Sequence, residues 1–348
     1  MPATTRAVVV HAPHDLRVES TPVGEPGPGQ VLVAVEAGGI CGSDLHYYHD
    51  GGFGTVRIKE PMILGHEVAG RVAAFGDGVM GLRVGQRVAL SPSNPCRRCR
   101  YCQQGLQQHC LDMRFYGSAM RFPHIQGAFR DRIVAEAHQC HPVAEGLSAG
   151  EAAMAEPLAV CLHAARRAGP LLGRRVLVTG SGPIGALAAI AARRAGATEI
   201  VATDVADAPL TVIRGLGVEQ ALNVASAPDA LEAFTADKGH FDVLFEASGN
   251  ERALVGALPA LRPGAVIVQI GIGSAMTLPM NIIVAKEFEL RGTFRFHEEF
   301  ALAVDLMGKG LVDVKPLISA TLPAERAVEA FALASDRTKA MKVQLAFQ

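Results

Sequence analysis

The stretch Val176-Leu-Val-Thr-Gly180-Ser-Gly-Pro-Ile-Gly185 decides the fold of the second half of this chain. A short apolar run leads into glycines spaced G-x-G-x-x-G, and an Ala-rich helical pattern follows from Ala186 to Ala192. Strand, glycine turn and helix in that order are typical of a dinucleotide-binding βαβ unit. Gly180 permits the tight turn, Gly182 lets the backbone approach a pyrophosphate, and Gly185 allows close packing of helix on strand. The N-terminus of the helix offers N–H groups and the positive end of its dipole to the phosphates.

A second apolar run, Glu199 to Thr203, is followed by Asp204. This is about the distance at which such units place an acidic residue that binds the adenosine ribose hydroxyls. A carboxylate there also repels the 2′-phosphate of NADP, and residues 205–209 contain no Arg or Lys to receive one. The sequence therefore favours NAD over NADP. Arg214 lies near enough in the chain to leave the use of both cofactors open.

Around this unit, apolar strands alternate with Ala-rich helical stretches. Strands are predicted at 175–179, 199–203, 241–245 and 265–269. This alternation predicts a parallel, doubly wound sheet. Residues 1 to about 145 instead carry short alternating runs bounded by turn residues, such as 30–36 and 69–75, and are predicted to be mostly β. The predicted fold class is therefore α/β, with a mostly β domain and a doubly wound cofactor domain, since one core rarely grows past roughly 250 residues.

The last part of the chain, after Gly292, predicts helices at about 298–309 and 324–333 and a final strand at 342–347. On pattern alone this segment could extend either domain. The formal net charge of −1 gives no electrostatic footprint for a nucleic-acid partner. No targeting segment and no membrane-spanning run is visible, so we expect a cytoplasmic protein in a reducing compartment that keeps thiolates available to metal.

Four cysteines within a short loop form a C-x2-C-x2-C-x7-C array: Cys96, Cys99, Cys102 and Cys110. Thiolates at this spacing fold around one ion, and four sulfur ligands leave no open position for a substrate. The array therefore predicts a structural zinc site. Paired disulfides or an iron–sulfur cluster are the alternatives. A disulfide between neighbouring C-x-x-C cysteines would be strained, and the sequence lacks the C-x3-C-P motif that would favour an iron–sulfur cluster.

A second set of metal-binding side chains is scattered along the chain. Cys41, His66 and Glu67 offer a thiolate, an imidazole and a carboxylate, a set that suits a zinc ion with an exchangeable position. Spacing alone supports this weakly, because a lone cysteine usually packs as a small apolar residue. Glu156 is surrounded in the sequence by apolar residues, so burial would be costly unless the carboxylate were paired or bound to metal. It could also be a simple carboxylate at a helix start.

Taken together, these residues resemble the zinc-containing medium-chain dehydrogenase/reductase family, in its polyol dehydrogenase branch, over nearly the whole chain. The shared motifs are Cys41-Gly-Ser-Asp44, Gly65-His66-Glu67, the four-cysteine array, Glu156-Pro157, the glycine loop and Asp204. Further stretches resemble a member of the branch that oxidises a sugar acid; they are Ser43 to Tyr48, Ala155 to Ala159, Arg291 to Phe296, Pro316 to Ala320 and Lys342 to Leu345.

The resemblance implies a GroES-like catalytic domain at 1–150 with the zinc lobe at about 94–112, a Rossmann domain at 151–290, and a segment at 291–348 that completes the catalytic domain. It also implies two zinc ions per subunit. The catalytic one would be bound by Cys41, His66 and Glu67, with Glu156 as a further ligand, either directly or through water. Further cofactor contacts are implied at Pro183, Ile184, Ile270, Ile272 and Phe294.

The implied reaction is NAD-dependent oxidation of a secondary hydroxyl. Ser43 and His46 match the positions of a proton relay that runs through the cofactor ribose, and their alternatives are a turn serine and a surface histidine. Arg295 matches a polyol-contacting arginine and can grip a substrate carboxylate with two hydrogen bonds, unless it forms an ordinary salt bridge. Tyr47 is the predicted contact to a substrate hydroxyl, and Glu156 also borders the substrate.

A sugar acid is the predicted substrate, and a neutral polyol such as sorbitol or xylitol is the alternative. A protein that senses NAD without turnover is a more distant alternative, which the catalytic residues argue against. Both metal sets argue against a zinc-free quinone reductase of the same superfamily. The family usually associates through the edge of the cofactor-domain sheet, and the apolar residues 276–284 suit such an edge, so a homotetramer or dimer is expected.

Overall fold

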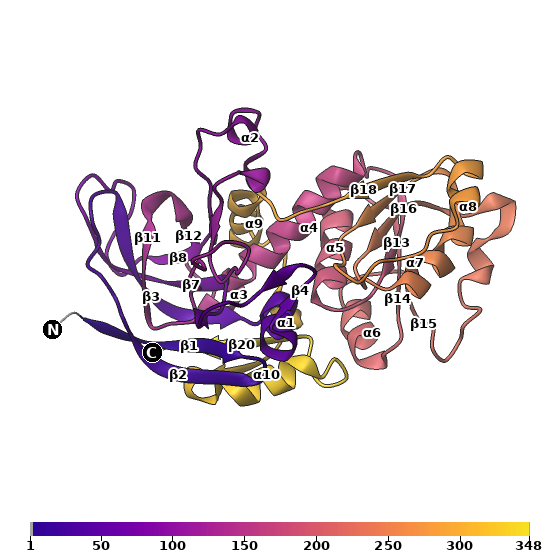
Figure 1. Ribbon diagram of the computed structural model, residues 1–348. Coiled ribbons are helices and arrows are strands. Elements are labelled where there is room, and N and C mark those ends of the chain that lie inside the picture. Colours follow the sequence, from indigo (N-terminus) through magenta and orange to yellow (C-terminus); the bar gives the residue numbers. More distant parts are fainter. Residues whose placement is uncertain (1–2, 348) are drawn as a thin grey trace. The chain divides into compact units, whose positions relative to one another are not determined.

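The computed structural model describes residues 3–347 as two compact units (Figure 1). The first contains the chain up to Glu156, then Phe300–Asp336 and the residues from Lys342; the second contains Pro157–Glu299 and Arg337–Met341. Residues 1–2 and 348, the ends of the predicted outer domain ranges, lie outside the described residues. The sequence predicts divisions at 150/151 and 290/291, whereas the units change at 156/157 and 299/300. Both changes fall in the first turn of a helix, Ala155–Ala168 or Glu299–Gly308, so no loop marks them.

The first unit is built mainly from strands. Its longer strands are β1 (Thr4–Ala12), β2 (Asp15–Pro22), β3 (Gln30–Gly39), β7 (Glu67–Phe75), β8 (Arg87–Leu90), β11 (Arg132–Glu136), β12 (Cys140–Pro142), β19 (Ile318–Pro323) and β20 (Lys342–Ala346). Two-residue strands are β4 (Gly52–Phe53), β5 (Val56–Arg57), β6 (Met62–Ile63), β9 (Ser93–Asn94) and β10 (Arg114–Phe115). The helices are α1 (Gly42–Asp50), α2 (Arg100–Gln103), α3 (Ala149–Ala153) and α10 (Ala327–Ser335).

These strands form two main sheets within residues 3–347. The larger has the order β12-β8-β7-β3-β20-β19, with β11 also paired to β3, and the smaller has the order β2-β1-β6. In β3, every second residue from Val31 to Ala37 is at most 5% exposed, as expected for a strand with one face on a core. The predicted strands at 30–36 and 69–75 lie inside β3 and β7, which extend further, to Gly39 and back to Glu67. Those extensions matter because they carry the candidate site.

The C-terminal strand β20 lies between β3 and β19 in the larger sheet. It runs antiparallel to β3, with Gln344 opposite Gly39, and the N–H of Ile40 donates to the carbonyl of Val343 at 3.0 Å. The first residue of β20, Lys342, is thereby brought to the end of β3. The helix predicted at about 324–333 begins with a 3₁₀ turn, Ala324–Arg326, and continues as α10 from Ala327.

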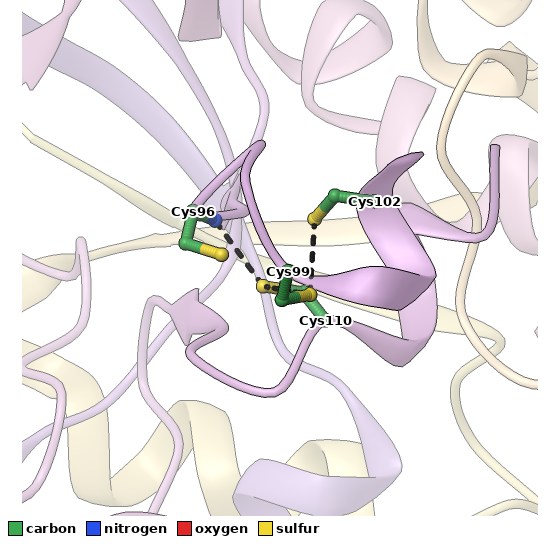
Figure 2. A group of neighbouring side chains, drawn as sticks. All are labelled: Cys96, Cys99, Cys102 and Cys110. Carbon is green, nitrogen blue, oxygen red and sulfur yellow. Dashed lines mark hydrogen bonds between the residues drawn. The ribbon is translucent and has the colours of Figure 1, made fainter. Parts of the chain in front are cut away.

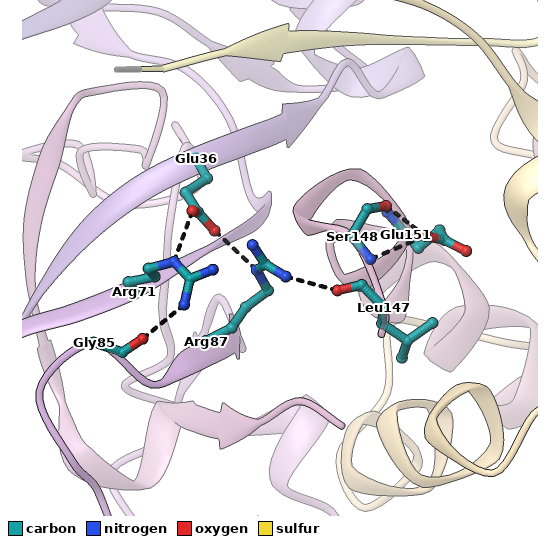
Figure 3. A network of polar contacts seen from close by, with 7 residues as sticks. All are labelled: Glu36, Arg71, Gly85, Arg87, Leu147, Ser148 and Glu151. Carbon is teal, nitrogen blue, oxygen red and sulfur yellow. Dashed lines mark hydrogen bonds and ion pairs between the residues drawn. The ribbon is translucent and has the colours of Figure 1, made fainter. Parts of the chain in front are cut away.

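A polar network ties strands of the larger sheet to α3 (Figure 3). The carboxylate of Glu36 accepts hydrogen bonds of 2.9 Å from Nε of both Arg71 and Arg87, and Arg87 also donates to the carbonyl of Leu147 at 2.8 Å. Burial raises the pKa of Glu36, but the two guanidiniums outweigh it and hold that pKa below its ordinary value of 4.5. Because Ser148 caps α3 directly after Leu147, the network fixes where the chain leaves the sheet.

The second unit is a parallel sheet with helices. Its strands are β13 (Arg175–Thr179), β14 (Glu199–Asp204), β15 (Gln220–Asn223), β16 (Phe241–Glu246), β17 (Leu261–Gln269) and β18 (Glu289–Gly292). Its helices are α4 (Ala155–Ala168) and α9 (Glu299–Gly308), which run across the unit boundaries, and α5 (Pro183–Arg194), α6 (Asp207–Arg214), α7 (Glu251–Ala257) and α8 (Met280–Ala285).

Among the described residues, the strand order is β15-β14-β13-β16-β17-β18, and all pairs are parallel. This is the order of a doubly wound dinucleotide-binding fold, so the predicted α/β fold class is confirmed. Val176, Leu177 and Val178 of β13 are 0% exposed, which explains why a continuous apolar run, not an alternating one, marks this strand. The sequence does not predict β15, which is short and only partly buried. Across residues 3–347, every helix is too short or too polar to span a bilayer.

Candidate metal centres and cofactor loop

The four cysteines of the predicted array converge in a lobe of the first unit, between β9 and β10 (Figure 2). Their sulfur atoms all lie within 4.8 Å of one another. Sγ of Cys99 is 3.6 Å from Sγ of Cys102 and 4.0 Å from Sγ of Cys110, well beyond the roughly 2.05 Å of a disulfide bond. All four are free thiols, and four sulfur donors in one place form the closed set of a structural zinc site.

Backbone N–H groups of the lobe point at these sulfur atoms. Sγ of Cys110 accepts from the N–H of Cys96 at 3.2 Å and from that of Asp112 at 3.3 Å. N–H groups of Cys102 and Leu111 lower the pKa of Cys99 to about 6. Burial instead raises the pKa of Cys102 to about 12 and also raises that of Cys110, so the N–H groups favour the metal-binding thiolate form at Cys99 in particular.

A second donor set lies where β3 and β7 pair. One ligand atom each of Cys41, His66 and Glu67 lies within 4.8 Å of the other two. The pairing of the strands explains how residues so far apart in sequence meet, because Gly39 is opposite Glu67 in the sheet. A Cβ on Gly39 would lie 2.2 Å from a carboxylate oxygen of Glu67, so a larger residue there would displace the Glu67 side chain. One thiolate, one imidazole and one carboxylate fit zinc with a position left for a substrate.

Asp44 joins the two loops that carry Cys41 and His66. Its carboxylate is 0% exposed and accepts hydrogen bonds from the N–H of Cys41 at 3.0 Å and from that of Gly65 at 3.1 Å. Nδ1 of His66 is 3.7 Å from Asp44, too long for a hydrogen bond, and it has no hydrogen-bond partner among the described residues. Burial lowers the pKa of His66, but Asp44 and Cys41 outweigh it and hold that pKa well above 6.5. Surrounding anions that favour a proton on His66 also favour a metal cation beside it.

Lys342 is the residue of this centre that sequence reasoning missed. Its ammonium group donates to both carboxylate oxygens of Glu67, at 2.9 and 2.8 Å, and to the carbonyl of Ile40 at 3.1 Å. The two side chains are 4% and 1% exposed. Burial lowers the pKa of Lys342, yet Glu67 and then Cys41 raise it above its ordinary value, so the lysine stays charged. Lys342 begins one of the stretches that resemble the family, but that resemblance assigns it no role, and only the pairing of β20 with β3 reveals its partner.

Glu156 begins α4 close to the same charges. It is 5% exposed, and its charge contributes to raising the pKa of both His66 and Lys342. Its carboxylate is not part of the donor set within 4.8 Å that the described residues form. The centre therefore consists of three convergent donors and a nearby fourth carboxylate.

Comparison with known proteins identifies the lineage of this fold and these centres. Residues 27–145 match the alcohol dehydrogenase GroES-like domain, and residues 183–309 match the zinc-binding dehydrogenase domain. L-idonate 5-dehydrogenase (NAD(P)(+)) of Escherichia coli K12 is 44% identical over 317 residues, which cover 91% of each chain. The chain belongs to the zinc-containing medium-chain dehydrogenase/reductase family. The family resemblance that the sequence motifs indicate is thereby confirmed.

One further member of this family and a solved structure of the E. coli enzyme are similar to this chain over most of their length. Human sorbitol dehydrogenase is 34% identical over 336 residues, 93% of this chain and 91% of that one. The crystal structure of L-idonate 5-dehydrogenase from E. coli K-12 superposes with a TM-score of 0.95 at 42% identity, covering 100% of this chain and 99% of that chain. As a member of the family, the protein is an oxidoreductase of the zinc-binding dehydrogenase type.

The glycine loop of the second unit has the geometry of the family's cofactor site. A Cβ on Gly185 would lie 1.7 Å from the carbonyl oxygen of Gly180, and Gly180 has a φ of +84°. A Cβ on Gly182 would meet nothing within 4 Å, so protein packing does not require glycine there. Approach of a ligand to the backbone does explain it. Pro183 begins α5, and Ile184 follows it in the first turn.

Asp204 lies at the end of β14 and is already bound to the loop. One of its carboxylate oxygens accepts from the N–H of Ser181 at 2.6 Å, and the other accepts from the N–H groups of Val205 and Ala206. A ribose hydroxyl at this carboxylate would share it with those amides. Glu246, 0% exposed at the end of β16, accepts from the N–H groups of Ser248 and Gly249 in the same way. No sequence motif pointed to Glu246.

The predicted relay residues lie on one face of α1, three residues apart. Ser43 is half-buried, and His46 is exposed with Nδ1 3.1 Å from a carboxylate oxygen of Asp50. Among the described residues, no hydrogen bond joins Ser43 to His46. Tyr47 is 2% exposed, and its hydroxyl accepts from the N–H of Ala119 at 3.0 Å.

The remaining predicted residues lie in the second unit. Ile270 follows β17 and is half-buried, whereas Ile272 is 69% exposed. Phe294 and Arg295 follow β18, with the Arg295 guanidinium 4.9 Å from the centre of the Phe294 ring. Arg295 has a φ of +53°, a conformation that costs a non-glycine residue about 1 kcal/mol or more and is enriched at functional sites.

Proposed function

We propose that this protein oxidises the 5-hydroxyl of L-idonate to give 5-keto-D-gluconate, with NAD as the hydride acceptor and zinc at the Cys41–His66–Glu67 centre. The convergence of one thiolate, one imidazole and one carboxylate supports the reaction type. The 44% identity to L-idonate 5-dehydrogenase supports the substrate. We further propose a second, structural zinc in the four-cysteine lobe, because its sulfur donors leave no position for a substrate.

A zinc ion in the open centre would supply Lewis-acid polarisation that lowers the pKa of the substrate hydroxyl. The chain's own residues do the rest. Cys41, His66 and Glu67 would hold the ion. Asp44 would join the loop that carries Cys41 to the loop that carries His66. Ser43 and His46 would carry the hydroxyl proton away from the centre, with the exposed His46 as the end of the relay that reaches solvent. Bound NAD would supply the hydride acceptor, and the glycine loop with Asp204 would hold it. Glu156, close by but outside the donor set, would act on the ion through water or as an exchanging ligand.

A sugar acid differs from a neutral polyol by its carboxylate. Arg295 is the residue that we propose binds it, since a guanidinium pairs with a carboxylate through two parallel hydrogen bonds. Tyr47 would contact a substrate hydroxyl while it supports the loop at Ala119. The second candidate function is oxidation of a neutral polyol at the same centre. The 34% identity to human sorbitol dehydrogenase supports it, more weakly than the 44% identity supports L-idonate.

For the cofactor, we propose NAD, with the glycine loop at the pyrophosphate and Asp204 at the ribose. Ile270, Ile272 and Phe294 are the further proposed contacts. The E. coli relative is named for both NAD and NADP, so activity with NADP at a lower kcat/KM is compatible with the proposal.

Steady-state rates on a panel of substrates test the proposal. NADH formation from L-idonate, sorbitol, xylitol and L-threonine is measured with one preparation of known zinc content. We expect kcat/KM for L-idonate to exceed that for sorbitol and for xylitol by at least about tenfold, since a charge-assisted, bidentate contact to the carboxylate is worth roughly 1.5–3 kcal/mol. A higher kcat/KM for sorbitol or xylitol would instead establish the neutral-polyol alternative. A kcat/KM for NADP equal to that for NAD would contradict the cofactor assignment.

We also propose that the protein is a cytoplasmic homo-oligomer, a dimer or tetramer, that associates through β18. In the described chain this strand ends the sheet, and apolar residues near it are exposed: Met280 is 60%, Val284 71% and Leu290 48% exposed. An open strand edge beside apolar side chains suits pairing with a second copy. Light scattering in solution distinguishes the two assemblies from a monomer.

A further inference from the structure

The region that contains the cysteine lobe has an unusual charge pattern. Between Asp77 and Asp131 the only acidic residue of the sequence is Asp112, and lysine is absent. The same stretch has eight arginines: Arg83, Arg87, Arg97, Arg98, Arg100, Arg114, Arg121 and Arg130. The chain as a whole has a formal net charge of only −1, so this is a local excess of positive charge.

Three of these arginines lie between the cysteines themselves. Arg97 and Arg98 separate Cys96 from Cys99, and Arg100 follows Cys99. All three are exposed. Within residues 3–347, none of the three forms a salt bridge, whereas Arg87 pairs with Glu36 and Arg121 with Asp112. Arg100 packs over the ring of Tyr101, 5.0 Å from its centre.

Backbone N–H groups of Arg97 and Arg98 also interact with the sulfur atoms of the lobe. The N–H of Arg98 lowers the pKa of Cys96, whereas burial raises the pKa of Cys102 despite the opposing effect of the N–H of Arg97. Arg97 adopts a φ of +59°, a left-handed conformation that is costly for a side chain with a Cβ. The chain therefore accepts backbone strain at a residue whose N–H faces a sulfur atom. That places a guanidinium side chain one residue from a ligand.

We infer that Arg97, Arg98 and Arg100 are positioning residues that supply the countercharge for a zinc–tetrathiolate centre and slow the loss of its metal. This rests on the proposed structural zinc. Four thiolates and one Zn²⁺ carry a net charge of −2. Cys96 and Cys99 are only half-buried, so this charge reaches the surface where the arginines stand. Each guanidinium stabilises the charged, metal-bound lobe relative to an opened one in which a thiol has taken up a proton.

The rate of zinc release tests this inference without using enzyme activity. Measurements are made in a His66→Ala background, so that the metal released comes from the lobe. The variant Arg97→Gln/Arg98→Gln/Arg100→Gln is compared with the parent, using a chromogenic chelator at low salt. We expect release to be roughly tenfold faster in the variant. At 1 M salt, where the Debye length falls to about 3 Å, the two rates should converge.

Two matched variants separate charge from other effects. Arg97→Lys/Arg98→Lys/Arg100→Lys keeps the charge and should release zinc at a rate close to that of the parent. Arg83→Gln/Arg194→Gln/Arg337→Gln removes the same charge from exposed sites outside the array and should also match it. Equal release rates for the parent and the glutamine variant of the array, or fast release from the lysine variant, would overturn the inference. If the His66→Ala parent holds no zinc at all, the structural zinc itself is refuted, which is a different outcome.

Discussion

Replacing His66 by alanine will lower kcat/KM for the alcohol substrate by at least about 10³-fold, roughly 4 kcal/mol of transition-state stabilisation. Among the donors that the described residues bring together at the open centre, His66 supplies the one nitrogen atom, and it is 5% exposed. Without it, a thiolate and a carboxylate alone would have to hold the ion. The variant should therefore also contain one zinc per chain where the unchanged protein contains two, as measured by atomic emission on the purified protein.

His109→Ala is the matched control for this variant. His109 is an exposed histidine of the lobe that lies next to Cys110 but is not part of the donor set. This change should leave zinc content and turnover within about twofold of the unchanged protein, as for most exposed positions. A His66→Ala protein that keeps two zinc ions and turns over within tenfold of the unchanged enzyme would place the reaction elsewhere.

Replacing Lys342 by methionine will destabilise the metal-free first unit by about 3–5 kcal/mol, because it leaves the Glu67 carboxylate buried without its cation. Urea unfolding of chelator-treated protein measures the effect. In zinc-loaded protein the decrease in the free energy of unfolding should be smaller, since the metal ion can neutralise part of the charge of the Glu67 carboxylate. The two measurements together report whether lysine and metal share this carboxylate.

A second substitution tests the cause of that loss. In metal-free protein, Glu67→Leu/Lys342→Met removes both charges and should be more stable than Lys342→Met alone. The exposed pair Lys309 and Asp305 gives the control, and Lys309→Met should cost less than about 1 kcal/mol. If Lys342→Met costs no more than Lys309→Met, the buried ion pair has no structural role.

The sequence predicts the second unit better than the first. The strand β13 is predicted to the residue, and the glycine turn and α5 are predicted in the right order, although α5 begins three residues before and ends two residues after the predicted 186–192. A buried parallel strand and a phosphate loop each impose a local pattern. In the first unit, β3 and β7 extend beyond their predicted ends to Gly39 and Glu67. Those ends lack the alternating pattern because the charged and small residues there serve the metal centre.

For the site, local spacing predicts only the cysteine lobe, whose four ligands are close together in the chain. Cys41, His66 and Glu67 meet through the pairing of β3 with β7, which no local pattern encodes, and the family resemblance was needed to group them. Lys342 comes from the other end of the chain and was missed because its role depends on where β20 inserts. Asp44 lay within a quoted motif, but its hydrogen bonds to both ligand loops appear only in the folded chain.

The most direct test of the central claim is the visible spectrum of protein that carries cobalt(II) in the Cys41–His66–Glu67 centre while the lobe keeps zinc. If the substrate hydroxyl binds at the open position of this centre, L-idonate will shift the cobalt absorption bands, with half-saturation near its KM. Sorbitol should produce the same shift only at higher concentration. A spectrum that L-idonate leaves unchanged, in a preparation that still oxidises it, would contradict the account.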